Sequence, residues 1–278
     1  MQALNLGCGD RFLSGWENVD FAPTNPLVRA YDLRRGVPYP DNFFDLVYHS
    51  HLLEHFSKDE APQFLRECFR VLKHEGILRV VVPDLEGIAR FYLQALERAS
   101  QGFEGWDRNY DWMTIELYDQ AVRERSGGNY VEFFKRKALT NWEFISHRVG
   151  AYGESLRMCF SGEGNPQSLR CQQFERGWLE TIKNTRKAIW NAVIRALIGK
   201  RDWDCLQLGR FRRNGEIHMW MYDSYSLARL LNSTGFSYPR KVSAKESHIP
   251  NWSSFSLDTE PDGRIYKADS LYMEAIKL

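Results

Sequence analysis

The chain has 278 residues, with 37 lysines and arginines against 36 aspartates and glutamates, and a formal net charge of +1. This length allows one large domain, or one domain with an insertion, to bury a substantial core. A near-zero net charge gives no general attraction to nucleic acid, so we expect no nucleic-acid substrate.

The first residues predict a short strand followed by a glycine turn. Leu4-Asn5-Leu6 runs into Gly7-Cys8-Gly9-Asp10, and glycines allow a backbone to approach a ligand closely. Asn18-Val19-Asp20 predicts a second strand that ends in a carboxylate, which suits the two hydroxyls of a ribose. The two strands therefore indicate the nucleoside-binding edge of a Rossmann-like sheet.

The next segments alternate between strand and helix patterns. Residues 28–33 and 44–50 predict two further strands, and 57–74 predicts an amphipathic helix that opens with a capping box. Residues 77–83 form a β-branched run, which is typical of a buried parallel strand. This alternation indicates an α/β fold with a mostly parallel sheet.

Taken together, these segments resemble a class I S-adenosylmethionine-dependent methyltransferase, within a bacterial group often linked to cell-surface polysaccharide and other biosynthetic gene clusters. The resemblance is carried by LNLGCGD at 4–10, NVD at 18–20, residues 44–56 with 69–84, and residues 218–236 with 270–278. It implies a Rossmann-like methyltransferase sheet, mostly parallel with an antiparallel last strand. It also implies S-adenosylmethionine as the cofactor, S-adenosylhomocysteine as the product and no metal.

The resemblance also implies which residues hold the cofactor. Gly7 and Gly9 would frame its methionine end, Asp20 would hold the ribose, and Asp32 would lie beside the adenine. Asn5 stands where the family more usually has an acid, so contact with the cofactor's amino group falls to Asp10 or to water. The expected cofactor-binding residues are Gly7, Cys8, Gly9, Asp10, Asp20, Phe21, Asp32, Leu33, His49 and Ser50.

The sheet pattern resumes only near the end of the chain. Residues 223–234 predict the last sheet-covering helix, and 240–245 and 271–277 predict the final two strands. We therefore expect a cofactor-binding domain made of 1–83 and 223–278, interrupted by a mainly helical insertion, 84–222, that binds the substrate or acts as a lid. The helices predicted within it span 85–99, 106–125, 130–149 and 176–198.

Two parts of the insertion suggest specific roles. Residues 110–120 mix aromatics with carboxylates, as sugar pockets do, although an amphipathic helix with core aromatics fits the same pattern. Residues 178–198 form a basic amphipathic segment that would suit peripheral contact with an anionic membrane, or packing on the domain with a solvated rim. The expected substrate-binding residues are Tyr110, Asp111, Trp112, Glu116 and Tyr222.

Catalysis is predicted at the strand ends beside the cofactor. Methyl transfer from a sulfonium is an in-line displacement, so the protein aligns the groups and supplies a base. His51 is the first candidate for that base, with His55 second and His218 as a further possibility. Residues 51–55 also spell the H-x-x-E-H of a class of zinc peptidases, but that motif requires a long helix and here follows a strand. No metal is therefore expected.

The predicted activity is transfer of a methyl group to an acceptor hydroxyl, on a sugar or glycan. The alternatives are N-methylation of a peptide or natural-product side chain, and a cofactor-binding partner module without activity. Five cysteines without a C-x-x-C pair predict free thiols in a reducing compartment. No segment reads as a signal peptide or membrane span, so a cytoplasmic location is expected.

Overall fold

A computed structural model describes residues 1–278 except 24, 137 and 162–184. Within these residues one seven-stranded sheet has the order β3-β2-β1-β4-β5-β7-β6. All neighbouring strands pair in parallel except at β7, which is antiparallel to both β5 and β6. The predicted α/β fold with an antiparallel last strand is confirmed. The strands are β1 (Ala3–Leu6), β2 (Glu17–Asp20), β3 (Arg29–Ala30), β4 (Phe44–Ser50), β5 (Leu72–Pro83), β6 (Ser237–Val242) and β7 (Ser270–Ile276).

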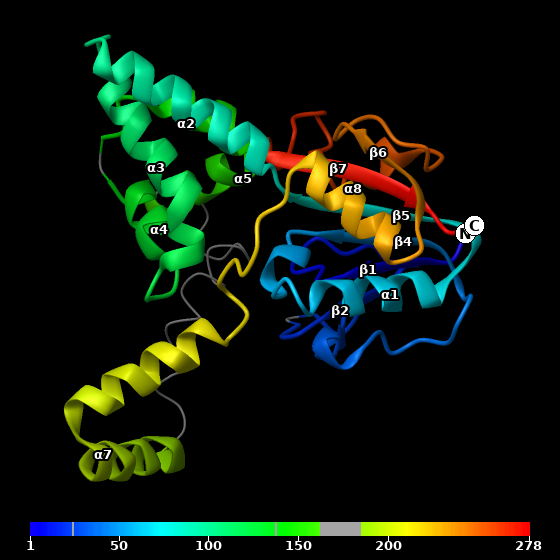
Figure 1. Ribbon diagram of the computed structural model, residues 1–278, viewed down its shortest axis with the longest axis horizontal. Coiled ribbons are helices and arrows are strands. Elements are labelled where there is room, and N and C mark those ends of the chain that lie inside the picture. The colour runs from blue at the N-terminus through cyan, green and yellow to red at the C-terminus, as the bar shows by residue number, and fades with distance from the viewer. Residues whose placement is uncertain (24, 137, 162–184) are drawn as a thin grey trace.

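The two faces of the sheet are covered differently. On one face, α1 (Ala61–Val71) and α8 (Ser224–Ser233) pack their apolar sides onto the strands in one continuous core (Figure 1). On the other face, the chain between β6 and β7 supplies Ile249, Trp252 and Leu257 as the cover. Residues 7–16 between β1 and β2 form no helix, as the short link in the sequence indicates.

The insertion builds a separate hydrophobic core of its own. It contains α2 (Leu85–Ser100), α3 (Trp106–Val122), α4 (Gly128–Phe134), α5 (Trp142–Ser161) and α7 (Thr185–Arg212). Trp112, Tyr130 and Phe134 lie at the centre of this core, which is distinct from the two cores of the sheet. Figure 1 shows α2 to α5 grouped to one side of the sheet. The helices of residues 85–161 therefore pack mainly on one another rather than on the sheet.

Some predicted boundaries are wrong. The third strand, expected over 28–33, is reduced to the exposed pair Arg29–Ala30 because it lies at the edge of the sheet. The helix expected over 130–149 is split into α4 and α5, since residues 135–136 and 138–141 are not helical. Ser57 and Glu60 exchange the hydrogen bonds of a capping box, but they do so in a turn before α1, which begins at Ala61.

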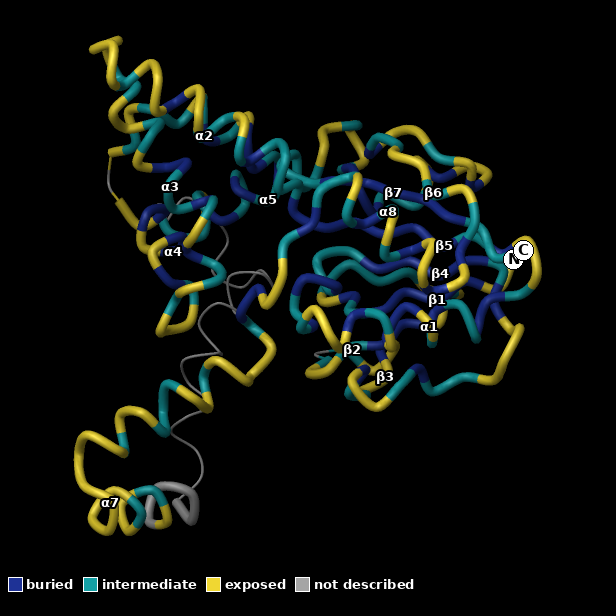
Figure 2. Tube along the Cα trace, viewed as in Figure 1, coloured by how far each residue is buried: buried dark blue, intermediate teal, exposed yellow. Residues whose placement is uncertain are grey.

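The segment α7 differs from the rest of the insertion in its exposure. It extends away from the other helices, and Figure 2 shows its described part as exposed or intermediate, without a buried residue. Its apolar side chains Trp190 and Leu197 are 64% and 80% exposed. These two residues therefore do not show the packing onto the domain that was one of the two expectations for this segment. Residues 178–184 of the predicted basic segment lie outside the described residues. No helix in the described part of the chain has the length and hydrophobicity needed to cross a bilayer.

The cysteines fulfil the prediction only in part. Cys8, Cys68 and Cys205 are free thiols. Cys159 takes part in a disulfide, so the prediction of five free thiols is wrong at this position. Cys171 lies outside the described residues.

Candidate functional site

The glycine turn after β1 is fastened to the end of β2. Gly7 and Gly9 both have positive φ, at 62° and 52°, and a Cβ on Gly7 would stand 2.8 Å from the Leu52 side chain. The Gly9 backbone N–H donates to the Asp20 carboxylate at 2.9 Å, and the Ala22 N–H donates to its other oxygen at 3.0 Å. The carboxylate is therefore held in one orientation at the carboxyl edge of the sheet.

Two pockets open at this edge and share Gly7 and His51. We call the first the strand-end pocket; it has a volume of about 540 Å³. Its walls come from the ends of β2 and β3, from the turn after β4 and from the end of α7. It is lined by Gly7, Asp20, Phe21, Ala22, Tyr31, Asp32, Leu33, Arg34, His51, Leu52, His55, Phe56, Ser57, Glu60, Arg212, Arg213, Asn214, Gly215, Ile217 and Met219.

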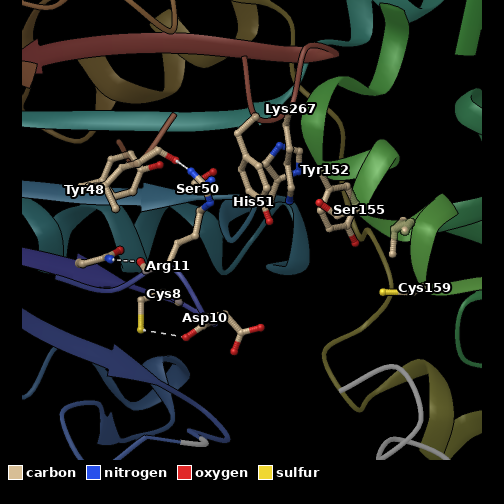
Figure 3. Close-up of a pocket in the computed structure, with 16 residues that line it drawn as sticks. Cys8, Asp10, Arg11, Tyr48, Ser50, His51, Tyr152, Ser155, Cys159 and Lys267 are labelled. Carbon is tan, nitrogen blue, oxygen red and sulfur yellow. Dashed lines mark hydrogen bonds between the residues drawn. The ribbon is translucent and has the colours of Figure 1, made fainter. Parts of the chain in front are cut away.

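The second pocket, which we call the interdomain pocket, has a volume of about 240 Å³. The glycine turn and the end of β4 form one side, and α5 with the segment before β7 forms the other (Figure 3). It is lined by Asn5, Gly7, Cys8, Gly9, Asp10, Arg11, Tyr48, Ser50, His51, Tyr152, Ser155, Leu156, Cys159, Leu257, Tyr266 and Lys267. The insertion thus contributes a wall to a pocket that begins in the sheet domain.

A kink in α5 fastens the insertion to this wall. Gly150 has φ 67° and ψ −159°, outside the helical region, and its position would leave a Cβ only 2.6 Å from the Ile265 carbonyl oxygen. The N–H groups of Ala151 and Tyr152 donate to the carbonyls of Ile265 and Tyr266 at 3.0 and 2.8 Å. Only glycine fits this contact, and the contact sets Tyr152 beside the segment that carries Lys267.

Lys267 is a lysine in a partly buried position on the wall of the interdomain pocket. Its ammonium lies 5.0 Å from the centre of the Tyr152 ring. Burial lowers the pKa of Lys267 to about 8, although Glu54 and Asp269 act in the opposite direction. An amine with this pKa is partly neutral near neutral pH and can accept a proton.

The predicted catalytic histidines meet around the buried Glu54. His51 adopts the left-handed region with φ 51°; its Nε2 lies 2.8 Å from Ser270 Oγ and its Nδ1 3.3 Å from Glu54 Oε1. His55 Nδ1 lies 3.1 Å from the Ile217 carbonyl oxygen, and its ring centre is 5.0 Å from that of His218. Burial holds the pKa of both His51 and His218 well below the usual value.

The three histidines differ in their access to the pockets. His51 lines both pockets, and His55 lines the strand-end pocket. His218 is buried and lines neither. Both ring nitrogens of His51 face a polar neighbour, which leaves Lys267 as the better-placed proton acceptor on the pocket wall.

Nine of the ten predicted cofactor residues line a pocket. Cys8, Gly9, Asp10 and Ser50 line the interdomain pocket, and Gly7 lines both. The strand-end pocket is lined by Asp20, Phe21, Asp32 and Leu33. His49 is fully buried, and its ring packs against Phe64 of α1 at 5.3 Å. Because side chains alternate along β4, His49 points to the opposite face from Tyr48 and Ser50.

Asp32 already has a partner in the strand-end pocket. Its carboxylate accepts hydrogen bonds from Arg34 Nε and Nη2 at 2.8 and 2.9 Å, and these bonds lower the pKa of Asp32. It also caps the short 3₁₀ turn Leu33–Arg35. A nucleobase at this edge would therefore meet an Asp32–Arg34 pair. Phe21, which is 63% exposed, lies beside this pair, with its ring centre 5.7 Å from the Arg34 guanidinium carbon.

The predicted substrate residues lie elsewhere. Trp112 is fully buried in the insertion core and donates to Glu116, which also pairs with Arg148. Tyr110 packs against Tyr92, and Asp111 is exposed. Tyr222 is buried where Asp84 and Leu85 pair with its backbone. None of the five lines either pocket, so their placement favours packing roles over contact with a substrate.

The sequence reasoning missed the pocket wall formed by α5 and residues 257–267. Tyr152, Ser155, Tyr266 and Lys267 belong to no recognisable motif, and residues 257–267 read as a loop between strands. Arg11 was also missed. Its guanidinium donates to the carbonyls of Ser256, Leu257 and Thr259 and stacks 3.5 Å from the centre of the Tyr266 ring. Only the fold brings these residues to the glycine turn.

Several solved structures are similar to the chain. A crystal structure of YcgJ from Bacillus subtilis is 21% identical over 35% of this chain and 51% of that one, with a TM-score of 0.26. The PH0226 protein of Pyrococcus horikoshii OT3 is 26% identical over 32% and 52%, with a TM-score of 0.27. A SAM-dependent methyltransferase from Archaeoglobus fulgidus is 12% identical over 99% and 86%, with a TM-score of 0.36.

The chain spans about half the length of the first two of these proteins. No curated protein matches it. Residues 17–80, from β2 into β5, match the family model described as Methyltransferase domain. The sheet is Rossmann-like, residues 17–80 are similar to a methyltransferase domain, and S-adenosylmethionine is the cofactor that this match supports.

Proposed function

We propose that the protein transfers a methyl group from S-adenosylmethionine to a hydroxyl of a sugar or glycan. The observation that carries this proposal is the meeting of two pockets at Gly7 and His51. One pocket is lined by strand-end acids that suit a nucleoside. The other is lined by aromatic and polar side chains from two parts of the chain.

The cofactor would span both pockets. Its ribose would lie on Asp20, whose carboxylate is already oriented by two backbone N–H groups and keeps further lone pairs for hydroxyls. Its adenine would lie beside Phe21 and the Asp32–Arg34 pair. The methionine end would pass the glycine turn into the interdomain pocket, where Asp10 and Ser50 face it.

The acceptor would enter against the wall formed by the insertion. Tyr152 provides a ring for the C–H face of a sugar, and Ser155 provides a hydroxyl for hydrogen bonding. Methyl transfer needs the acceptor oxygen, methyl carbon and sulfur in line, and the hydroxyl must lose its proton as the bond forms. Lys267 on the same wall would take that proton, with His51 as its neighbour across the pocket.

The cofactor half is tested by titrating S-adenosylmethionine into the wild type and Asp20→Asn. The amide keeps the shape of the side chain but loses its charge and one acceptor, so we expect at least a tenfold loss of affinity. Asp107→Asn, at an exposed carboxylate of α3 that lines neither pocket, is the matched control and should bind as the wild type. Unchanged affinity in Asp20→Asn would contradict the cofactor placement.

The acceptor half is tested with isotopically labelled S-adenosylmethionine and fractionated extract of the source organism. Label in glycans or lipid-linked sugars supports the proposal, whereas label confined to peptides or amines overturns the hydroxyl acceptor. In the positive fraction, Lys267→Met should reduce transfer at least a hundredfold while cofactor affinity stays within about twofold. Transfer at the wild-type rate would exclude Lys267 as the base.

A further inference from the structure

We propose that Glu54, His55 and His218 form a binding site for one divalent metal ion, with zinc as the best-matched ion. This inference does not depend on the proposed methyl transfer. It departs from the expectation of no metal, which rested on the H-x-x-E-H spacing of residues 51–55 and on the absence of a long helix there. The structure builds a different ligand set, because the third side chain comes from residue 218.

The three side chains converge in space. One ligand atom from each lies within 4.8 Å of the others. His218 Nε2 is 4.0 Å from Glu54 Oε1. Zinc bonds of about 2.0–2.2 Å place tetrahedral ligand atoms roughly 3.4 Å apart, so side-chain movements of about 1 Å would complete the site.

The carboxylate at its centre lacks hydrogen bonds. Glu54 is fully buried, and among the described residues neither of its oxygens has a hydrogen-bond partner. His51 Nδ1 lies 3.3 Å from Oε1 but is not aligned to donate to it. His218 is 6% exposed, and its Nδ1 also lacks a partner. A buried carboxylate without partners is costly, and a bound cation would remove that cost.

The backbone around the ligands is already fixed. The His55 Nδ1–H donates to the Ile217 carbonyl, which orients the ring and leaves Nε2 as the coordinating atom. The N–H groups of Met219 and Trp220 both donate to the Glu54 carbonyl oxygen, at 2.7 and 3.2 Å. The segment with Glu54 and His55 is thus joined by hydrogen bonds to the residues before and after His218.

The donor set points to zinc among the divalent ions. Two imidazoles and one carboxylate with an open position form a known kind of zinc site, whereas magnesium and calcium prefer sites made of oxygen. His55 lines the strand-end pocket, which provides a route for the ion. The positive charge of Lys267 acts on Glu54 and would repel a cation bound there. Removing this charge should therefore strengthen metal binding, which can be tested.

The experiment uses untagged, chelator-treated protein that carries Cys205→Ser, because this exposed thiol would also bind zinc. Zinc is titrated against a fluorescent chelator, and Co²⁺ absorption reports the ligand geometry. We expect one equivalent of zinc and Co²⁺ bands in the visible range. Glu54→Gln and His218→Ala should each weaken zinc binding at least tenfold, and His74→Ala, at an exposed histidine, should leave it unchanged.

Lys267→Met removes the opposing charge and should tighten zinc binding about threefold or more. Circular dichroism and thermal melting establish that each variant is folded. If a ligand variant fails to fold, the proposal is tested instead by the stoichiometry of zinc binding to the wild type and by its Co²⁺ spectrum. Absence of one-to-one zinc binding by the wild type, or wild-type affinity in a folded Glu54→Gln, would overturn the site. The failure of methyl transfer would leave this result untouched.

Discussion

The sheet domain and the helical insertion keep charge in their interiors in different ways. In the sheet domain, Arg79 is fully buried and pairs with both Asp258 and Glu274, so one cation joins β5, β7 and the covering loop. In the insertion, Glu116 pairs with Arg148 beside an aromatic core, and the largely buried Arg123 side chain pairs with both Asp119 and Glu216. The Arg79 network joins strands and the covering loop in the frame that carries the site, whereas the pairs of the insertion join its helices and the segment after α7 to one another.

The candidate acceptor site lies at the boundary between the sheet domain and the insertion. Each region has its own hydrophobic core, and the interdomain pocket lies where the two regions meet. The sheet domain supplies the glycine turn and the strand-end acids. The insertion supplies one wall through the contact of Gly150 with residues 265–268. Changes in either core should therefore affect stability, and changes at the contact should affect the pocket.

The largest effect is expected for Arg79→Met. Removing this cation leaves two buried carboxylates without their partner, which should lower the free energy of unfolding by about 3–5 kcal/mol. Arg90→Met is the matched control, because Arg90 is exposed and its ion pair with Glu86 is worth about 1 kcal/mol or less. Equal losses in urea unfolding would show that the buried network does not organise the sheet.

The next effect concerns the contact between the two regions. Gly150→Ala would place a Cβ against the Ile265 carbonyl and force alanine into a region that glycine occupies, at a cost of about 2–4 kcal/mol. Gly102→Ala has a similar positive φ of 76° but open space around it, and should cost about 1 kcal/mol. Thermal melting measures both, and a cost for Gly150→Ala no larger than the control would contradict the docking role.

A smaller effect would distinguish a packing role for Glu116 in the insertion from a substrate-binding role. Glu116→Gln keeps an acceptor for Trp112 Nε1 but leaves Arg148 without its carboxylate, so we expect a loss of about 1–2 kcal/mol in unfolding free energy. Methyl transfer to the labelled fraction should keep its KM. A rise in KM without a loss of stability would instead return Glu116 to the acceptor site predicted from the sequence.

A further prediction concerns the pH dependence of stability, through a carboxyl group at the border of the two regions. Burial raises the pKa of Asp269 to about 7, against an ordinary value near 4. Between these values the folded state holds a proton that the unfolded state has lost, so this group stabilises the fold at low pH and loses that contribution as pH rises to about 7. Asp269→Asn should remove the decline in the free energy of unfolding that this group causes between pH 4 and 7. Parallel pH profiles of wild type and variant would exclude this assignment.

Sequence patterns predicted the parts of the site that lie on the sheet. Gly7 and Gly9 were identified because a turn with positive φ needs glycine, and Asp20 because a carboxylate ends a short strand. His49 was expected beside the cofactor, but its side chain points to the opposite face of the sheet. Side chains alternate between the two faces along a strand, and a mainly apolar run does not show which residues point to which face. Trp112 and Glu116 were read as a pocket because aromatics beside acids look the same in a core and in a binding site.

By itself, the sequence determined the mostly parallel sheet and the acids at its strand ends, because these depend on local periodicity and turn chemistry. The antiparallel last strand followed from the resemblance to a known family. The tertiary structure alone decided that α5 and residues 257–267 close the pocket, that Lys267 faces it, and that His218 joins Glu54 and His55. These groups come from segments more than 100 residues apart along the chain, or lack a motif. Only packing of the two cores brings them within contact distance.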